Sequence, residues 1–321
     1  MSGVTKALIL AGEPVEANRW RTLGVHARPL VPIANRPVVL HTLDALRSAG
    51  VREATVLADG AMRAALGEVL GRGTPELAIR YADHVDEQAL DARALVVEPA
   101  DALLRAPLDG VLGAVGDDDI DGAVLRLSPP ASSVPQVAAC VLGQDAAVAM
   151  AHSFDGWHGT VEAVADGLVA GSQRVRVGEV RGCRACAGGD DGLLHANRML
   201  LEGLVAGDTE ATLIGSEIQG AALIHPTATL ESTLVRGPAV IGPGAQLTDV
   251  YVGPSTSIGE GVRIEGAEVE HSLVLAGAQI SYPGARLTSS IIGPRARLVR
   301  DFHLPRGMRL TIGADSVVAM S

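Results

Sequence analysis

The chain has 321 residues, of which 47% are hydrophobic and 2% aromatic, so its core must consist of aliphatic side chains and alanine. Its formal net charge of −11 argues against nucleic acids and anionic membranes as partners. No run resembles a signal peptide or is long enough to span a bilayer, and three cysteines are too few for a disulfide framework. We therefore expect a cytoplasmic protein.

About the first 205 residues alternate short apolar runs with helical patterns, as is typical of an α/β domain. A buried first strand is expected at Val4–Leu10, and Pro37 should open a helix that ends at Gly50. The other expected strands are Glu53–Ala58, Leu77–Tyr81, Leu95–Val97, Ala123–Leu127, Val137–Leu142 and Val175–Val180, and the other expected helices are Ala61–Leu70, Thr160–Val169 and Leu193–Val205.

The pattern changes from about Ile218, where aliphatic residues recur at intervals of mostly six and Gly or Pro occupies many of the corners. A period of six that is sustained over this length indicates a β-helix, in which each coil stacks its aliphatic residue on the one below. We predict an α/β domain at 1–205 and a left-handed hexapeptide β-helix at 206–321, with a capping segment after Ile292. The recurring residues are Ile224, Leu230, Val235, Ile241, Leu247, Val252, Ile258, Ile264, Val269 and Val274.

Several segments resemble one family. The stretch "RPLVPIANRPVVLHTLDALRSAGV" (28–51) and the run His195–Arg198 resemble the sugar-1-phosphate nucleotidyltransferases. Residues 251–280 and 308–318 resemble the β-helix tail of the long glucose-1-phosphate thymidylyltransferases. The resemblance implies a nucleotidyltransferase-like, Rossmann-like mixed sheet. It also implies a reaction that joins a nucleoside triphosphate to a sugar 1-phosphate around Mg²⁺ and releases pyrophosphate.

The phosphate loop that the resemblance implies after the first strand departs from the family pattern. The family has Gly-Gly-x-Gly-Thr-Arg, whereas this chain has "GEPVEANR", in which only Gly12 and Arg19 match. Glu13 and Glu16 should repel a triphosphate, and Pro14 has no N–H to donate. We interpret this segment as a vestigial phosphate loop.

Four other positions that the resemblance identifies also differ from the family or match it weakly. Arg28 replaces one family lysine, and Ser128 replaces the lysine that holds the sugar phosphate. No shift of the alignment restores a lysine, because Lys6 is the only one in the chain. Asp101 falls where the first metal aspartate is expected, although a solvated loop carboxylate is the better explanation when this residue is taken alone. Cys186 replaces the second metal carboxylate, and Mg²⁺ prefers oxygen ligands.

These departures favour a relative that has lost catalysis and serves as a regulatory or structural subunit, with no cofactor. Its expected partner is a second copy of itself or an active homologue. The alternative is an unusual but active nucleotidyltransferase that uses Asp101, Arg19 and Arg28 with Mg²⁺ and makes a nucleotide sugar.

Two further patterns suggest other chemistry. Hexapeptide β-helices also occur in acyltransferases that use a histidine as general base, and His225, His271 and His303 are the candidates. The pair Cys183 and Cys186 forms a CxxC, which alone is a weak sign of a metal or redox site.

Overall fold

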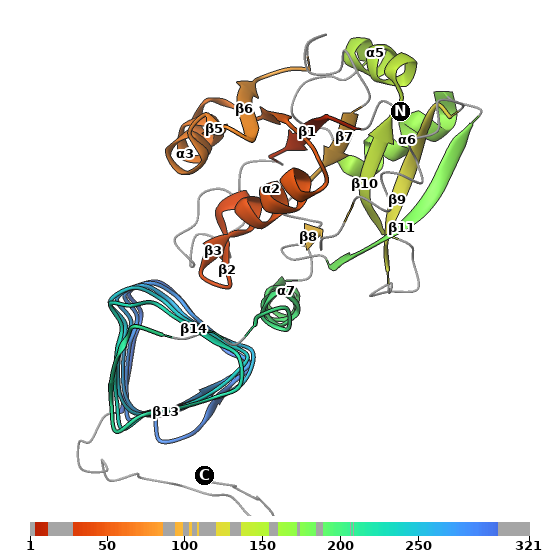
Figure 1. Ribbon diagram of the computed structural model, residues 1–321. Coiled ribbons are helices and arrows are strands. Elements are labelled where there is room, and N and C mark those ends of the chain that lie inside the picture. Colours follow the sequence, from red (N-terminus) through yellow and green to blue (C-terminus); the bar gives the residue numbers. More distant parts are fainter. Residues whose placement is uncertain are drawn as a thin grey trace, which may run out of the picture.

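The computed structural model describes residues 4–11, 28–85, 94–98, 103–104, 108, 120–128, 136–153, 160–171, 174–183, 189–205, 207 and 209–300. An α/β part comes first in the chain, and a stack of short parallel strands follows it (Figure 1).

The α/β part is built on one mixed sheet with the strand order β5-β6-β4-β1-β7-β10-β9-β11-β8. Strand β1 (Lys6–Leu10) pairs in parallel with β4 (Glu53–Leu57) on one side and with β7 (Ala94–Val97) on the other. Every strand predicted in this part is present, with ends that differ by a few residues. The remaining strands are β5 (Gly73–Thr74), β6 (Leu77–Ala82), β8 (Leu103–Leu104), β9 (Gly122–Ser128), β10 (Val137–Leu142) and β11 (Val175–Cys183).

Helices cover both faces of this sheet. Ala7 and Ile9 of β1 pack into the core that contains α2 and α3, whereas Leu8 and Leu10 pack into the core that contains α5 and α6. A central parallel strand buried on both faces explains the continuous apolar run "ALIL". The helices are α2 (Val38–Ser48), α3 (Gly60–Leu70), α5 (Gln144–Ser153), α6 (Val161–Gly171) and α7 (Gly189–Leu201).

Two helices differ from the sequence prediction. Helix α5 was not predicted, because its alanine-rich sequence carries little apolar periodicity. Helix α7 was predicted at Leu193–Val205 but begins at Gly189 and ends at Leu201. Asp190 and Asp191 therefore lie in its first turn, where carboxylates interact favourably with the helix dipole.

The strand stack, residues 212–299, winds as three-sided circuits (Figure 1). Thr212, Thr229, Gln246 and Arg263 pair in parallel register, so successive circuits lie 17 residues apart in sequence. The strands are β12 (Thr212–Ile214), β13 (Glu217–Gln219), β14 (Ala222–Ile224), β15 (Thr229–Glu231), β16 (Leu234–Arg236), β17 (Ala239–Ile241), β18 (Gln246–Val252), β19 (Thr256–Ile258), β20 (Arg263–Glu270), β21 (Leu273–Val274), β22 (Gln279–Ser281), β23 (Leu287–Thr288), β24 (Ile291–Ile292) and β25 (Arg297–Val299).

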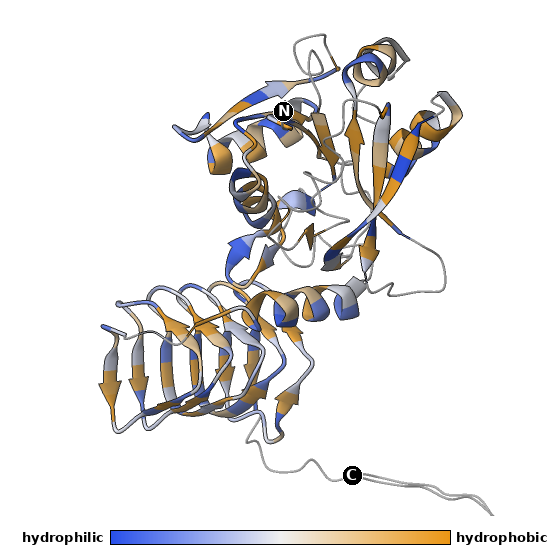
Figure 2. Ribbon diagram, turned by 45° about the vertical axis from the view of Figure 1, so that its right-hand side comes forward, coloured by the Kyte–Doolittle hydropathy of each residue, from blue (hydrophilic) through white to orange (hydrophobic). Residues whose placement is uncertain are grey.

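This arrangement is compatible with the predicted β-helix. All ten recurring aliphatic residues, from Ile224 to Val274, are buried in a single core, and apolar positions alternate with polar ones along the stack (Figure 2). The capping segment was predicted to follow Ile292, yet β25 still pairs in register with β22. The regular stack therefore extends at least to Val299. None of the helices in the described ranges is long and apolar enough to cross a membrane.

Candidate functional site

The carboxyl ends of the parallel strands define the candidate site. Strands β1, β4 and β7 run parallel, and β9 and β11 run in the same direction because β10 is antiparallel to both β7 and β9. The chain passes from β1 to β4 and β6 and then returns to β7 on the other side of β1. Ligands of open α/β sheets bind at the carboxyl ends of strands where the order reverses in this way. We call this edge, just beyond Leu10, Leu57, Val97, Ser128 and Cys183, the carboxyl edge.

A buried carboxylate that the sequence analysis did not single out lies at this reversal. Glu98 directly follows β7, is 3% exposed, and accepts a hydrogen bond from the N–H of Val161 through Oε2 at 3.4 Å. Val161 is the first residue of α6, so the carboxylate faces the positive end of a helix. A charged residue immediately after the apolar run "ALVV" was the available signal.

A second carboxylate at the carboxyl edge has a structural role. Asp59 follows β4 and caps α3, because its Oδ1 accepts the N–H of Met62 at 2.8 Å. This hydrogen bond satisfies one of the free donors at the helix start.

The structure describes two of the six substrate and metal positions that the resemblance identifies. Ser128 is the last residue of β9, so it lies at the carboxyl edge, and it pairs in register with Arg181 of β11. Arg28 is the half-buried first residue of the 3₁₀ helix η1 (Arg28–Leu30). The predicted phosphate-loop residues Gly12 and Arg19, the predicted metal ligand Asp101, and Cys186 lie outside the described residues.

The only lysine of the chain lies at the opposite end of the sheet. Lys6 is the first residue of β1, and its Nζ lies 3.6 Å from a carboxylate oxygen of Glu53, the first residue of β4. Both residues are therefore at the amino ends of their strands. The ammonium group cannot replace the lysines expected at the carboxyl edge.

The described cysteines are inert thiols. Cys183 ends β11 in a buried position, and burial raises its pKa to about 12. Burial, with smaller effects of Glu162 and Asp166, also raises the pKa of Cys140 to about 12. A thiol that stays protonated at neutral pH is a poor nucleophile and metal ligand. Within the described residues, no three His, Cys, Asp or Glu side chains are grouped so that they could hold a metal ion.

The segments that resemble the nucleotidyltransferases meet where the α/β part joins the strand stack. Asn197 of α7 is fully buried, and its Oδ1 accepts hydrogen bonds from the N–H of Ala34 at 3.0 Å and the hydroxyl of Ser257 at 2.6 Å. Its Nδ2 donates to the carbonyl of Ser255 at 2.9 Å. The amide thus connects the segment 28–51, helix α7 and strand β19.

The contact from segment 28–51 is a tight hairpin turn. Strands β2 (Pro32–Ile33) and β3 (Arg36–Pro37) pair antiparallel around Ala34 and Asn35, whose φ angles are +49° and +62°. Two central residues with positive φ correspond to a type I′ turn, a conformation that is energetically unfavourable for alanine. Nδ2 of Asn35 donates to the carbonyl of Ile258 at 2.6 Å, so the strand stack holds this turn from a second side.

An apolar cluster seals the same contact. It combines side chains of the hairpin segment, α7, the ends of β8 and β11, and the turn of the stack that contains β21. Figure 1 shows the hairpin and α7 side by side above the stack. We call this region the joint. Its buried apolar members are Val31, Ile33, Val38, Leu103, Cys183, Leu193, Ala196, Leu273 and Leu275.

Two of the three histidines proposed for acyl transfer are described, and they lie at separate places in the strand stack. Nδ1 of His225 lies 2.9 Å from the hydroxyl of Thr227. His271 is an exposed corner residue with a φ of +50°. His303 lies outside the described residues.

Comparison with known proteins agrees with this description. No family model matches the chain. It is 28% identical to a glucose-1-phosphate thymidylyltransferase from Streptomyces griseus over an alignment of 372 residues, which covers 98% of this chain and 99% of the relative. The fold matches the crystal structure of a proposed glucose-1-phosphate thymidylyltransferase from Bacillus anthracis in complex with a sucrose. That match has a TM-score of 0.50 and 14% identity, and it covers 63% of this chain and 97% of the other. The chain is thus a distant relative of a glucose-1-phosphate thymidylyltransferase, and its mixed sheet has the fold of these proteins.

Proposed function

We propose that this chain keeps the architecture of a sugar-1-phosphate nucleotidyltransferase without its reaction and serves as a structural or regulatory subunit. The observation that carries the proposal is the hydrogen bond between Ala34 and Asn197. The two segments that keep the family pattern meet there and build the joint. The segments expected to hold substrate, by contrast, depart from the pattern.

The distribution of positive charge supports the same proposal. Ser128 stands at the carboxyl edge where the resemblance implies a lysine, and Lys6 lies at the amino edge. Removing one group that stabilises developing charge commonly costs about 10²–10³ in rate. Because several such groups are replaced, the combined loss should leave no useful turnover.

The proposed role is exerted through assembly. We take the strand stack to be a left-handed hexapeptide β-helix, which its 17-residue register supports. Its first circuit exposes Leu213 (39%), Ile214 (52%) and Leu223 (60%) on strands that have a stack neighbour on one side. Such an edge favours pairing with a second copy or with an active homologue. Light scattering of the full chain tests whether it forms an oligomer, and a binding experiment tests whether it binds an active homologue. A monomer that binds no homologue would contradict this expectation.

One observation favours the alternative of an active enzyme. Glu98 places a carboxylate at the strand reversal, and carboxylate oxygens are ligands that Mg²⁺ accepts. In that case Glu98 would supplement Asp101, and the similarity to a thymidylyltransferase over the whole chain would extend to its reaction.

A pyrophosphate-release assay distinguishes the two functions. With dTTP, glucose 1-phosphate and Mg²⁺ we expect no release, and Ser128→Lys should not restore it, because the phosphate loop also departs from the family. Turnover of about 1 s⁻¹, which is ordinary for an enzyme, would overturn the proposal. If turnover is found, Glu98→Gln should abolish it.

A further inference from the structure

One corner of the strand stack departs from the regular circuit. Positions 231, 248 and 265 pair in register before this corner, and positions 235, 252 and 269 pair in register after it. Each of these three circuits therefore has three residues at the corner, namely 232–234, 249–251 and 266–268. In the next circuit the corresponding segment is Tyr282–Arg286, which has five residues. Insertions in repeat proteins map to loops on one face, and that face is often the binding face.

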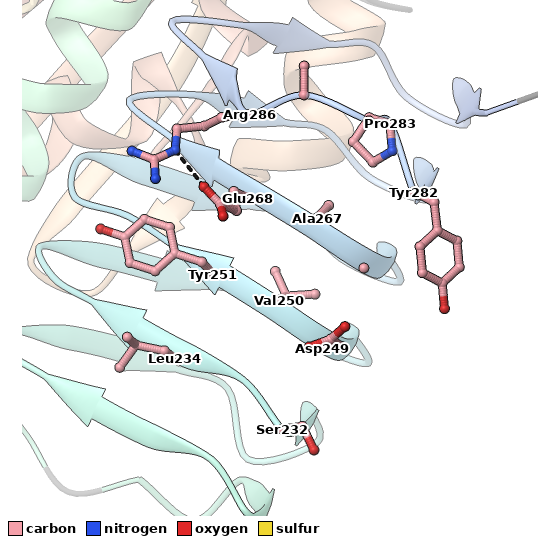
Figure 3. Close-up of a pocket in the computed structure, with 13 residues that line it drawn as sticks. Ser232, Leu234, Asp249, Val250, Tyr251, Ala267, Glu268, Tyr282, Pro283 and Arg286 are labelled. Carbon is pink, nitrogen blue, oxygen red and sulfur yellow. Dashed lines mark hydrogen bonds and ion pairs between the residues drawn. The ribbon is translucent and has the colours of Figure 1, made fainter.

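The longer corner and the circuits beneath it form a groove of about 540 Å³, within the size range of small-molecule sites (Figure 3). Two of the three tyrosines in the whole chain line it, although aromatic residues make up only 2% of the sequence. Tyr251 and Tyr282 lie on opposite sides of the groove, with Val250 and Ala267 between them.

One wall of the groove presents an aromatic ring, a cation and a carboxylate in a fixed arrangement. The guanidinium carbon of Arg286 lies 5.5 Å from the ring centroid of Tyr251. Its Nε donates to Oε2 of Glu268 at 2.6 Å, and its Nη1 lies 3.5 Å from Oε1 of Glu270. These contacts place the half-exposed guanidinium beside the ring and the carboxylates, so the wall offers hydrogen-bond donors and acceptors side by side.

The opposite wall depends on a glycine. The ring of Tyr282 packs on Gly266, whose φ is +58°, and a Cβ at that position would lie 2.2 Å from the ring. The Tyr282 hydroxyl donates to Oε1 of Glu265 at 2.8 Å, which raises the pKa of the phenol. The ring therefore stays neutral and is 42% exposed beside the groove.

The charges of the lining select the class of ligand. The carboxylates of Asp249 and Glu268 outnumber the one guanidinium, which disfavours phosphates and other anions. The guanidinium of Arg286, 5.5 Å from the centroid of the Tyr251 ring, would repel a second cation at that ring. A ligand with hydroxyl groups fits best, because a hydroxyl donates to a carboxylate and accepts from a guanidinium.

We propose that this groove binds a neutral saccharide. Its hydroxyls bond to Glu268, Asp249 and Arg286, and its apolar face packs against the ring of Tyr251. The groove lies on the strand stack rather than at the carboxyl edge. Its occupancy therefore does not depend on whether the α/β part retains catalysis.

Calorimetric titration of the full chain with glucose, maltose, cellobiose and sucrose tests this inference. We expect at least one of these sugars to bind. Tyr251→Ala should weaken that binding at least tenfold, and Tyr251→Phe, which keeps the ring, should change it less than threefold. Tyr81→Phe is the matched control, because Tyr81 lies on β6 outside the groove. An unchanged circular dichroism spectrum and melting temperature show that each variant is folded.

Three results would overturn the proposal. The first is that none of the four sugars binds the folded chain, and the second is that Tyr251→Ala binds sugar as tightly as the unmodified chain. The third is that N-acetylarginine amide binds more tightly than every sugar, which would make the groove a site for cations. Glucose 1-phosphate should not bind in this groove, so Tyr251→Ala should leave any binding of that compound unchanged.

Discussion

The backbone N–H of Ala34 donates a 3.0 Å hydrogen bond to Oδ1 of Asn197, which lies 163 residues further along the chain. The same oxygen accepts the hydroxyl of Ser257 from the strand stack. One buried amide therefore connects the hairpin turn, helix α7 and the stack. The positions of these three elements should depend on each other.

Replacing Asn197 with alanine should destabilise the chain by about 1–3 kcal/mol. The substitution leaves the part-buried N–H of Ala34 and the buried carbonyl of Ser255 without this partner, and an unsatisfied buried group costs that much. Urea unfolding measures the change. His195→Ala, on the exposed side of the same helix, is the control and should have little effect. Equal stability of Asn197→Ala and the unmodified chain would show that the amide does not hold the joint.

Ile258→Asp should unfold the strand stack at its contact with the α/β part. The side chain is fully buried in the stack core, and its carbonyl accepts the hydrogen bond from Asn35. An unpaired buried charge costs several kcal/mol. Hydrogen exchange should show faster exchange in β17, β19 and β21. Gln246→Asp, at an exposed position of β18 in the same stack, should leave exchange unchanged, and the prediction fails if both variants behave alike.

Addition of dTTP should raise the melting temperature little or not at all. A ligand present at 100 times its Kd stabilises a protein by about 2.7 kcal/mol, so retained binding would be easy to detect. Glu13 and Glu16 should exclude the triphosphate, and Glu13→Gly alone should not restore binding because Pro14 remains. A saturable shift in a thermal melt with Mg²⁺ would refute this expectation.

The stability of the chain should fall at alkaline pH through its two buried thiols. Burial raises the pKa of Cys140 and Cys183 from 9.0 to about 12, so their contribution is complete below pH 9 and is lost as the pH rises toward 12. At pH 10 the loss is about 1.4 kcal/mol per thiol. Between pH 7 and pH 10 the free energy of unfolding should decrease less in the double variant Cys140→Ala/Cys183→Ala than in the unmodified chain. Equal decreases would indicate that the thiols are accessible.

Rapid labelling by a thiol reagent provides an independent check on the same residues. At pH 8 Cys140 and Cys183 should not react in the folded chain, because a protonated buried thiol is a weak nucleophile. Both should react once denaturant unfolds the chain. Mass spectrometry of the labelled peptides identifies each cysteine. Modification of Cys183 in the native chain would contradict its assigned burial.

The sequence by itself determined the secondary structure wherever a residue's burial follows from a short repeating pattern. Ile241, Ile258 and Val274 lie in successive circuits of the stack, and the period that predicted their burial is local. The strands of the mixed sheet were predictable for the same reason, since an apolar run such as "ALIL" reports burial on both faces. Helix α5 was missed because its alanines carry no such pattern.

The tertiary structure alone decided which distant residues meet. In the sequence, Asn197 was only one residue of the run His195–Arg198 that resembles the family, and Glu98 was one of 37 acidic residues. The role of the first depends on residues 163 and 60 positions away, and that of the second depends on a helix 63 positions away. The groove beside Tyr251 likewise exists only because circuits of unequal length stack in register. Hydrogen bonds and packing across such separations follow from how whole elements dock, and no pattern within one element encodes them.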